Sequence, residues 1–210
     1  MARSRLNTVN KTVVTWATKP AANAFPVGVP IYISDVGVGG SRWITDGTNW
    51  YPEAGRLLLA QSGNPVSITG TATDQTGPSG TSRAIVTVPA GILLSNGSLE
   101  VETLWSYTNS ANAKNLRVRF GGTSGTVYLN TPPTTTGCVQ NICIIRNSNA
   151  TNSQKGFLAA ASSHFGSSTG TTTSTIDTTA AVDVVIGGQL TNTGETITLE
   201  SYVIWVRPSA

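Results

Sequence analysis

Charged residues and histidine are scarce in this sequence of 210 residues. Only 11% of the residues are charged, compared with about a quarter in an average soluble domain, and there is a single histidine. A metal site built from several histidines is therefore excluded, and any histidine-based catalytic triad would have to use His164. Basic residues gather before the first acid, at Arg3, Arg5, Lys11 and Lys19. Because they make no dense patch, we interpret them as a solvated tail rather than a nucleic-acid-binding surface.

Cysteine and long apolar runs are also scarce. The only cysteines are Cys138 and Cys143, whose odd separation places them on opposite faces of one strand, where they cannot form a disulfide. We expect both to be buried free thiols without a zinc site, because no His or Cys cluster surrounds them. No apolar run has the length of a signal peptide or a membrane helix. We therefore expect synthesis in a cytoplasm, no membrane insertion, and any release by a route such as cell lysis.

Ser, Thr, Asn and Gly supply the polarity that charge does not. Thr favours strands, whereas Gly and Asn favour turns, so this composition is typical of a β-protein. Short strands alternate with turn signals and no convincing helix is present. The main expected strands are 29–33, 57–60, 83–88, 99–107, 116–120, 126–129, 139–146, 156–160, 182–186 and 195–206. The fold predicted from this pattern is an antiparallel β-sandwich, jelly-roll-like, preceded by a small β-hairpin module and an extended N-terminal arm.

Three segments follow from this organisation. They are an arm over residues 1–24, a hairpin module over 25–61 and the β-sandwich over 62–210. The arm could hold a short strand or docking peptide near Val13. The Ser/Gly/Thr-rich tract from Ser162 to Ser174 is expected to be an exposed loop.

The hairpin module is expected to turn at Asp46-Gly47. Asp-Gly between β-formers is a strong signal for a two-residue type I′ turn, in which both central residues have positive φ. That turn would place Trp43 directly opposite Trp50, so that the two indoles clamp the hairpin.

Strict alternation predicts the buried faces of the next strands. Leu99, Val101, Thr103, Trp105 and Tyr107 share one face, and Leu116, Val118 and Phe120 share another. If the two strands pair around Ser110-Ala111, then Val101 lies opposite Phe120 and Glu102 lies opposite Arg119. On the final strand, one face is expected to carry Ile197, Leu199, Val203 and Trp205.

Two parts of the sequence resemble structural proteins of tailed bacteriophages. Residues 35–50, with the Trp43–Trp50 hairpin, are similar to a module of phage fibre proteins. Residues 104–112 with 116–123, and residues 187–190 with 194–200, are similar to a C-terminal β-domain of the same kind of protein. The resemblance carries structural signatures without catalytic residues.

The resemblance implies a component of a virion, made in the host cytoplasm. It implies a homotrimer anchored to capsid or tail proteins through the N-terminal arm, with the β-sandwich projecting outward. Because the chain has no long shaft, it favours a short fibre or a capsid-decoration protein. The alternative is a receptor-binding protein that recognises a host surface glycan.

The catalytic candidates in this sequence are a pair of glutamates and the single histidine. Glu100 and Glu102 share a strand face at a spacing near that of glycosidase carboxylates, but ion pairing with Arg117 and Arg119 is the preferred interpretation. Ser163 and His164 lie at the edge of the Ser/Gly/Thr tract and are interpreted as loop residues.

Cation and sugar binding remain as alternatives. Asp35 and Asp46 could hold a cation, although the turn already explains Asp46. Tyr107, Tyr128 and the tryptophans could stack on sugars, but core packing is preferred for each. The Thr- and Asn-rich loops are better candidates for receptor contact. We therefore assign no catalytic, cofactor-binding or metal-binding residue and expect a non-enzymatic protein.

Overall fold

The computed structural model describes residues 12–72, 84–157 and 170–210. The chain divides into two compact units, Met1–Ala54 and Gly55–Ala210. The described residues form an all-β protein whose one helical element is a short 3-10 turn, η1 (Ala22–Ala24). The prediction of an all-β fold is confirmed.

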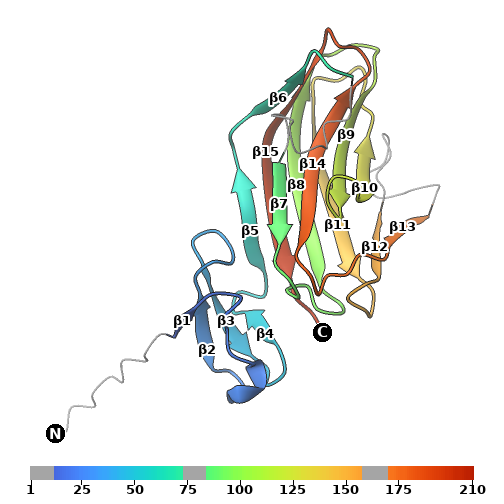
Figure 1. Cartoon of the computed structure of the whole chain (residues 1–210). Helices are drawn as coiled ribbons and strands as arrows, with labels where there is room; N and C mark the ends of the chain where they lie inside the picture. The colour runs from blue at the N-terminus through green and yellow to red at the C-terminus, as the bar shows by residue number, and fades with distance from the viewer. Residues whose placement is uncertain (1–11, 73–83, 158–169) are drawn as a thin grey trace, which may run out of the picture. The chain divides into compact units, whose positions relative to one another are not determined.

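The first unit is a small four-stranded sheet in the order β1-β2-β3-β4. Its strands are β1 (Val13–Val14), β2 (Pro30–Ile33), β3 (Ser41–Thr45) and β4 (Trp50–Pro52). The sheet is antiparallel except at β1, which runs parallel to β2 and pairs Val13 with Tyr32. The described part of the expected arm is therefore joined to the sheet of this unit (Figure 1).

The β3–β4 hairpin turns differently from the prediction. Thr45 pairs with Trp50 and Trp43 pairs with Pro52, so the connection spans residues 46–49 and the two indoles do not face each other. Gly47 has φ of 92°, but Asp46 is not among the residues with positive φ, as a type I′ turn requires. Instead, the Asp46 carboxylate accepts hydrogen bonds from the backbone N–H groups of Thr48 (2.8 Å) and Asn49 (2.7 Å). The side chain builds a longer turn and shifts the register.

Each indole of the hairpin packs against an aromatic side chain from the preceding segment. Trp43 is fully buried, with its ring centroid 5.0 Å from that of Trp16. Trp50 is also buried, lies 5.8 Å from the ring of Phe25, and donates its indole N–H to the carbonyl of Pro20 at 2.9 Å. These contacts fasten residues 12–25 to the sheet and supply much of the apolar core of this small unit.

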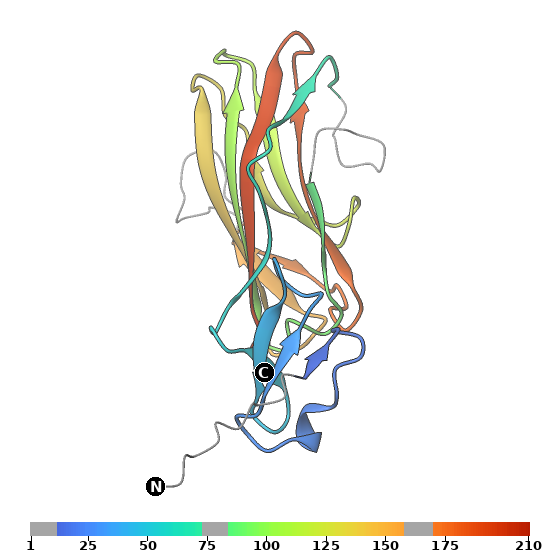
Figure 2. The same cartoon turned by 90° about the vertical axis from the view of Figure 1, so that its left-hand side faces the viewer.

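The second unit is a sandwich of two antiparallel sheets (Figure 2). The larger sheet has the order β13-β12-β11-β8-β15-β5, with β6 also paired to β15; the smaller sheet has the order β10-β9-β14-β7. The strands are β5 (Leu57–Ser62), β6 (Val66–Thr69), β7 (Ala84–Val88), β8 (Ser98–Tyr107), β9 (Lys114–Phe120), β10 (Thr126–Thr131), β11 (Cys138–Asn147), β12 (Gln154–Phe157), β13 (Thr171–Ser174), β14 (Val182–Leu190) and β15 (Thr196–Arg207).

This strand order is that of a jelly roll. Along described links, the chain crosses between the sheets from β7 to β8, from β8 to β9, from β10 to β11, from β13 to β14 and from β14 to β15. As a result β15 lies beside β8 in one sheet while β14 lies beside β9 in the other, which is the doubled Greek-key arrangement. Strands β12 and β13 extend one edge of the larger sheet. The predicted jelly-roll-like sandwich is confirmed.

The inward faces of β8 and β9 are those that alternation predicts. The five alternate residues of β8, from Leu99 to Tyr107, are buried, and so are Leu116, Val118 and Phe120 of β9. The predicted pairing of these strands is wrong, however. β8 pairs with β11 and β15, whereas β9 pairs with β10 and β14. The link over 108–113 carries the chain from one sheet to the other, so the two apolar faces meet across the core rather than within one sheet.

Strand β15 changes its inward parity halfway along. A register shift between Leu199 and Ser201 leaves Glu200 as an extra residue opposite β8. Ile197 and Leu199 are buried before this bulge, and Ile204 and Val206 after it. The predicted single face that also carried Val203 and Trp205 is therefore wrong, because a bulge moves the later side chains to the other face. Trp205 lies outside the core, with the Arg56 guanidinium 4.0 Å from its ring.

Two further expectations differ from the structure. Residues 57–61, expected in the hairpin module, are part of β5, which pairs with β15 and belongs to the second unit. Within the expected 162–174 loop, Thr171–Ser174 form β13, because their extended backbone pairs with Gln154–Phe157. Residues 162–169 of that loop lie outside the described residues.

Candidate binding surface at one end of the sandwich

The acidic and basic residues of the expected carboxylate site lie on different sheets. Glu100 and Glu102 are on β8, and Glu100 forms an ion pair with Arg207 (3.2 Å) on the neighbouring β15. Arg117 and Arg119 are on β9 of the other sheet, where they donate to Asn130 Oδ1 and to a backbone carbonyl. The predicted ion pairing between these groups is wrong, because it relied on the mistaken β8–β9 pairing.

The other polar candidates hold local structure. Asp35 accepts a hydrogen bond from the backbone N–H of Trp16 (2.7 Å), and Asp46 accepts those of its own turn. The Asn49 and Thr48 amides lower the pKa of Asp46 from its ordinary value. Ser163 and His164 lie outside the described residues. In the described ranges, no group of three or more His, Cys, Asp or Glu side chains gathers in a way that could hold a metal ion.

The cysteines occupy opposite faces of β11, and both are free thiols. The inward residues of this strand are Asn141, Cys143, Ile145 and Asn147, so Cys143 is buried and Cys138 is exposed. Burial raises the pKa of the Cys143 thiol to about 12. The prediction of buried thiols is thus confirmed for Cys143 and wrong for Cys138, which points outward by its parity.

Most of the aromatic candidates belong to the cores, as expected. Trp105 and Tyr128 are fully buried, and Tyr107 is nearly so. Burial also raises the pKa of the Tyr128 hydroxyl, which shares a hydrogen bond with Ser174 (2.7 Å). These rings therefore serve packing rather than a surface site.

Three loops meet at one end of the sandwich and form an exposed polar surface. They join β8 to β9 (108–113), β10 to β11 (132–137) and β14 to β15 (191–195). We call this surface the loop platform. Its exposed residues are Thr108, Asn109, Ala111, Asn112, Thr134, Thr135, Thr136, Gly137, Thr191, Asn192, Thr193 and Gly194. None of these residues is charged, so the platform presents hydroxyl, amide and backbone groups.

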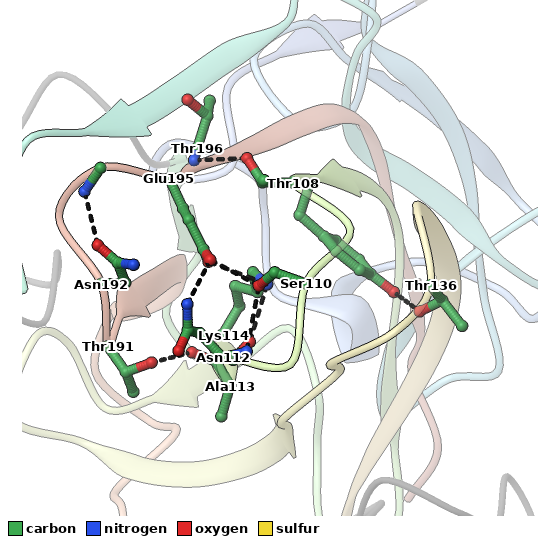
Figure 3. Close-up of polar contacts among 12 residues, drawn as sticks. Thr108, Ser110, Asn112, Ala113, Lys114, Thr136, Thr191, Asn192, Glu195 and Thr196 are labelled. Atoms are coloured by element: carbon green, nitrogen blue, oxygen red, sulfur yellow. Dashed lines mark hydrogen bonds and ion pairs between the residues drawn. The ribbon is translucent and has the colours of Figure 1, made fainter.

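A buried ion pair lies beneath the platform (Figure 3). Lys114 Nζ is 2.9 Å from Glu195 Oε2, with the side chains 0% and 7% exposed. The ammonium also donates to Ser110 Oγ (2.7 Å) and to the carbonyl of Asn112 (2.8 Å). Glu195 Oε1 accepts hydrogen bonds from Ser110 (2.5 Å) and from the Asn112 amide (2.7 Å). The two charges at this end are therefore buried together. Their short separation and the additional hydrogen bonds offset the desolvation cost of burying them.

The same hydrogen bonds hold the pKa of Glu195 far below its usual range, at about 2. Those from Asn112 and Ser110 contribute most, and Lys114 adds to them. Each stabilises the carboxylate form, so Glu195 stays ionised at any physiological pH.

Further hydrogen bonds tie the three loops into one body. Thr191 donates to the carbonyl of Ala113 (2.6 Å), and the Thr196 amide donates to Thr108 Oγ1 (3.0 Å). On the other side, the Tyr107 hydroxyl bonds to Thr136 Oγ1 at 2.5 Å. The platform is therefore a preorganised surface, suited to contact with another molecule.

A shallow hollow of about 390 Å³ lies on the larger sheet where β5 gives way to β6. β5 pairs with β15 from Tyr202 onward and β6 pairs with it up to Leu199, so both strands leave β15 near its bulge. The hollow is lined by side chains that include Gln61, Asn64, Ser201 and Tyr202. Its lining residues include one tyrosine, two residues with side-chain amides and two serines, and none of them is charged.

Sequence reasoning did not single out Lys114 or Glu195. A signal for both was present in the alternation, because Lys114 shares its parity with Leu116 and Glu195 shares its parity with Ile197. A charged residue on a buried strand face needs a partner of opposite charge. Among the described residues at this end of the sandwich, Lys114 and Glu195 are the only buried charged residues, and they pair with each other.

Comparisons with known proteins add little. No family model matches the sequence, and no curated protein matches it. Among solved structures, dimeric latent PorU from Porphyromonas gingivalis is similar at 8% identity, with a TM-score of 0.34 over 70% of this chain and 12% of PorU. A CBM4 structure is similar at 12% identity, with a TM-score of 0.25 over 67% of this chain and 89% of the other. Such low similarity does not bear on activity or ligands.

No helix in the described ranges has both the length and the apolar character needed to cross a membrane.

Proposed function

We propose that this chain is a non-enzymatic structural protein of a bacteriophage virion, either a short trimeric fibre or a capsid-decoration protein. In this proposal the N-terminal segment attaches the protein to capsid or tail proteins, and the jelly roll is the projecting part. The proposal rests on two phage-like segments, residues 104–112 with 116–123 and residues 187–190 with 194–200.

One observation about those two segments supports the proposal most strongly. Hydrogen bonds join them beneath the platform, since Ser110 and Asn112 of the first segment donate to the carboxylate of Glu195 in the second. The phage-like residues therefore serve to rigidify an exposed loop platform. A rigid neutral surface on a β-scaffold suits a particle component that must present a fixed shape outside the cell.

The virion assignment is tested on purified particles. Antibodies raised against residues 84–157 should label intact phage particles in electron microscopy, on the head for a decoration protein or on the tail for a fibre. Particles that carry no detectable chain by labelling and by mass spectrometry would overturn the assignment.

The trimer is tested separately by size exclusion with light scattering. A homotrimer should give three times the 21.8 kDa mass of the chain. A stable monomer across micromolar concentrations would exclude the trimer and leave the virion assignment to the particle experiment.

The hollow beside Tyr202 favours a second candidate function, recognition of a host surface glycan. A sugar presents an apolar ring face and neutral hydroxyl groups, which match an aromatic ring flanked by the amides of Gln61 and Asn64. On a glycan array, Tyr202→Ala should abolish binding that the wild-type protein shows. Gln140→Ala, an exposed change on β11, is the matched control and should leave binding intact. A wild-type protein that binds no glycan would exclude this function.

A further inference from the structure

Three polar atoms in the sandwich core form no hydrogen bond. They are Thr103 Oγ1, Trp105 Nε1 and Asn141 Nδ2, and none has a partner among the residues that the structure describes. The three side chains are 2%, 0% and 2% exposed. Leaving a polar group buried without a partner is costly, so native proteins almost always satisfy such groups with protein or with ordered water.

The three residues are neighbours on one inward face. Thr103 and Asn141 are register partners on the adjacent strands β8 and β11, and Trp105 is the next inward residue along β8. Asn141 also reaches the opposite sheet, because its Oδ1 accepts a long hydrogen bond (3.4 Å) from Thr131 on β10. The cluster therefore lies between the two sheets of the second unit.

The chemistry of the three atoms calls for a small ligand that both accepts and donates. The indole N–H and the Asn141 amide can only donate, whereas the Thr103 hydroxyl can accept. A water molecule accepts from the two N–H groups and donates to the hydroxyl, which gives the three hydrogen bonds typical of a buried water. An ion does not fit, because a cation would face two donors and an anion would lie in a buried site without a positive charge to pair with.

We propose that the jelly-roll core binds one ordered water molecule between Thr103, Trp105 and Asn141. This internal water completes the hydrogen bonding of a polar layer that joins β8, β11 and, through Thr131, β10. The inference concerns the fold and stands whether or not the protein belongs to a virion.

A crystal structure of the wild-type protein at about 1.6 Å resolution or better tests the proposal directly. It should show a density peak within about 2.7–3.2 Å of Thr103 Oγ1, Asn141 Nδ2 and Trp105 Nε1. Side chains that hydrogen-bond one another directly, with no peak between them, would overturn it.

Thermal unfolding of Thr103→Val gives an independent test through the sign of its effect. If the hydroxyl bonds to a water, valine removes one of its three partners and Tm should fall by about 2–4 °C. If the hydroxyl has no partner, the isosteric apolar side chain removes a desolvation cost and Tm should rise. A rise would therefore contradict the internal water.

Thr178→Val is the matched control. Thr178 is also buried, but it donates to the Thr151 carbonyl (2.7 Å) and accepts from the Asn147 amide (2.9 Å) within the protein. Its replacement must lower Tm whether or not the core holds water. If Thr103→Val does not fold, water relaxation dispersion on the wild-type protein provides the test. It should reveal a long-lived buried water molecule. A dispersion amplitude of zero would refute the proposal.

Discussion

The two ends of the sandwich are held by buried polar networks of different chemistry. At the loop platform, the network centres on a full ion pair between Lys114 and Glu195. At the opposite end, where β8 begins and β11 finishes, the network contains only neutral groups and centres on the amides of Gln154 and Asn147.

The neutral network satisfies each of its members with protein atoms. The Gln154 amide donates to Asn147 Oδ1 and to the carbonyl of Ile176, both at 2.9 Å, and its carbonyl accepts from Ser174 (2.9 Å). Asn147 in turn donates to the Leu94 carbonyl (2.5 Å) and to Thr178 Oγ1 (2.9 Å). The Asn147 side chain thereby joins the end of β11 to the loops that contain Leu94 and Thr178, and no charge is buried.

Both networks hold loops together at one end of the sandwich, but their contributions to stability should respond differently to mutation and to pH. Burying two charges has a large desolvation cost that only an intact pair offsets, whereas burying amides requires only that every group be bonded. The charged end should therefore respond strongly to loss of one partner and to acid, and the neutral end should not respond to acid.

The largest effect should come from breaking the ion pair on one side. Lys114→Met leaves the Glu195 carboxylate buried without its cation and should lower the free energy of unfolding by about 3–5 kcal/mol. Denaturant unfolding measures this loss. The double variant Lys114→Met/Glu195→Leu should recover most of it, and a double variant as unstable as the single would contradict this account.

Breaking the neutral network should have a smaller effect. Gln154→Leu removes the group that bonds Asn147, Ser174 and the Ile176 amide, and should cost about 2–3 kcal/mol at any pH between 3 and 8. The control is Lys155→Ala, an exposed change on the same strand, which should be nearly neutral. A Gln154→Leu loss that varied with pH would show that the network is not neutral.

Acid should weaken the charged end only. The pKa of Glu195 falls from 4.5 to about 2 on folding, so its contribution to stability is complete above about pH 4.5. That contribution is lost as the pH falls from about 4.5 through 2. Measured by denaturant unfolding between pH 6 and 2, this part of the acid sensitivity should persist in Gln154→Leu and disappear in the Lys114→Met/Glu195→Leu variant. Equal acid sensitivity in both would contradict the role of Glu195.

The smallest effect should come from the rim of the charged end. Tyr107→Phe removes the hydroxyl that bonds Thr136 and keeps the buried ring, so it should cost about 0.5–1.5 kcal/mol. Hydrogen exchange should become faster at Gly137 and its neighbours while the amides of β9 keep their protection. Loss of protection across β9 would mean that this bond supports the whole end.

Much of the fold could be predicted from local pattern. The inward residues of β8 and β9 follow from alternation, and so does the strand-rich class. The pairing of those strands could not be predicted. Alternation shows which side chains face inward, but two such strands give the same sequence pattern whether they are neighbours in one sheet or face each other from two sheets. The Asp46 turn was misjudged for a related reason, since its carboxylate competes with the backbone for the turn amides.

The candidate surface could be predicted only in part. The Thr- and Asn-rich loops were identified as contact candidates from composition, and the structure brings three of them together. The ion pair beneath them could not be located, because Lys114 and Glu195 are far apart in the chain and meet only when the sheets assemble. The hollow beside Tyr202 could not be located either, because residues 61–64 and 201–203 meet only when β5 pairs with β15.

By itself, the sequence determined the β class, the inward faces of the central strands and the aromatic character of the small unit. These follow from the pleat, which repeats every two residues and is visible in any short window. The tertiary structure decided which strands became neighbours, where β15 changed face, and which charges met in the interior. Those outcomes depend on contacts between residues distant in the chain, whose free energy appears only when both sheets are in place.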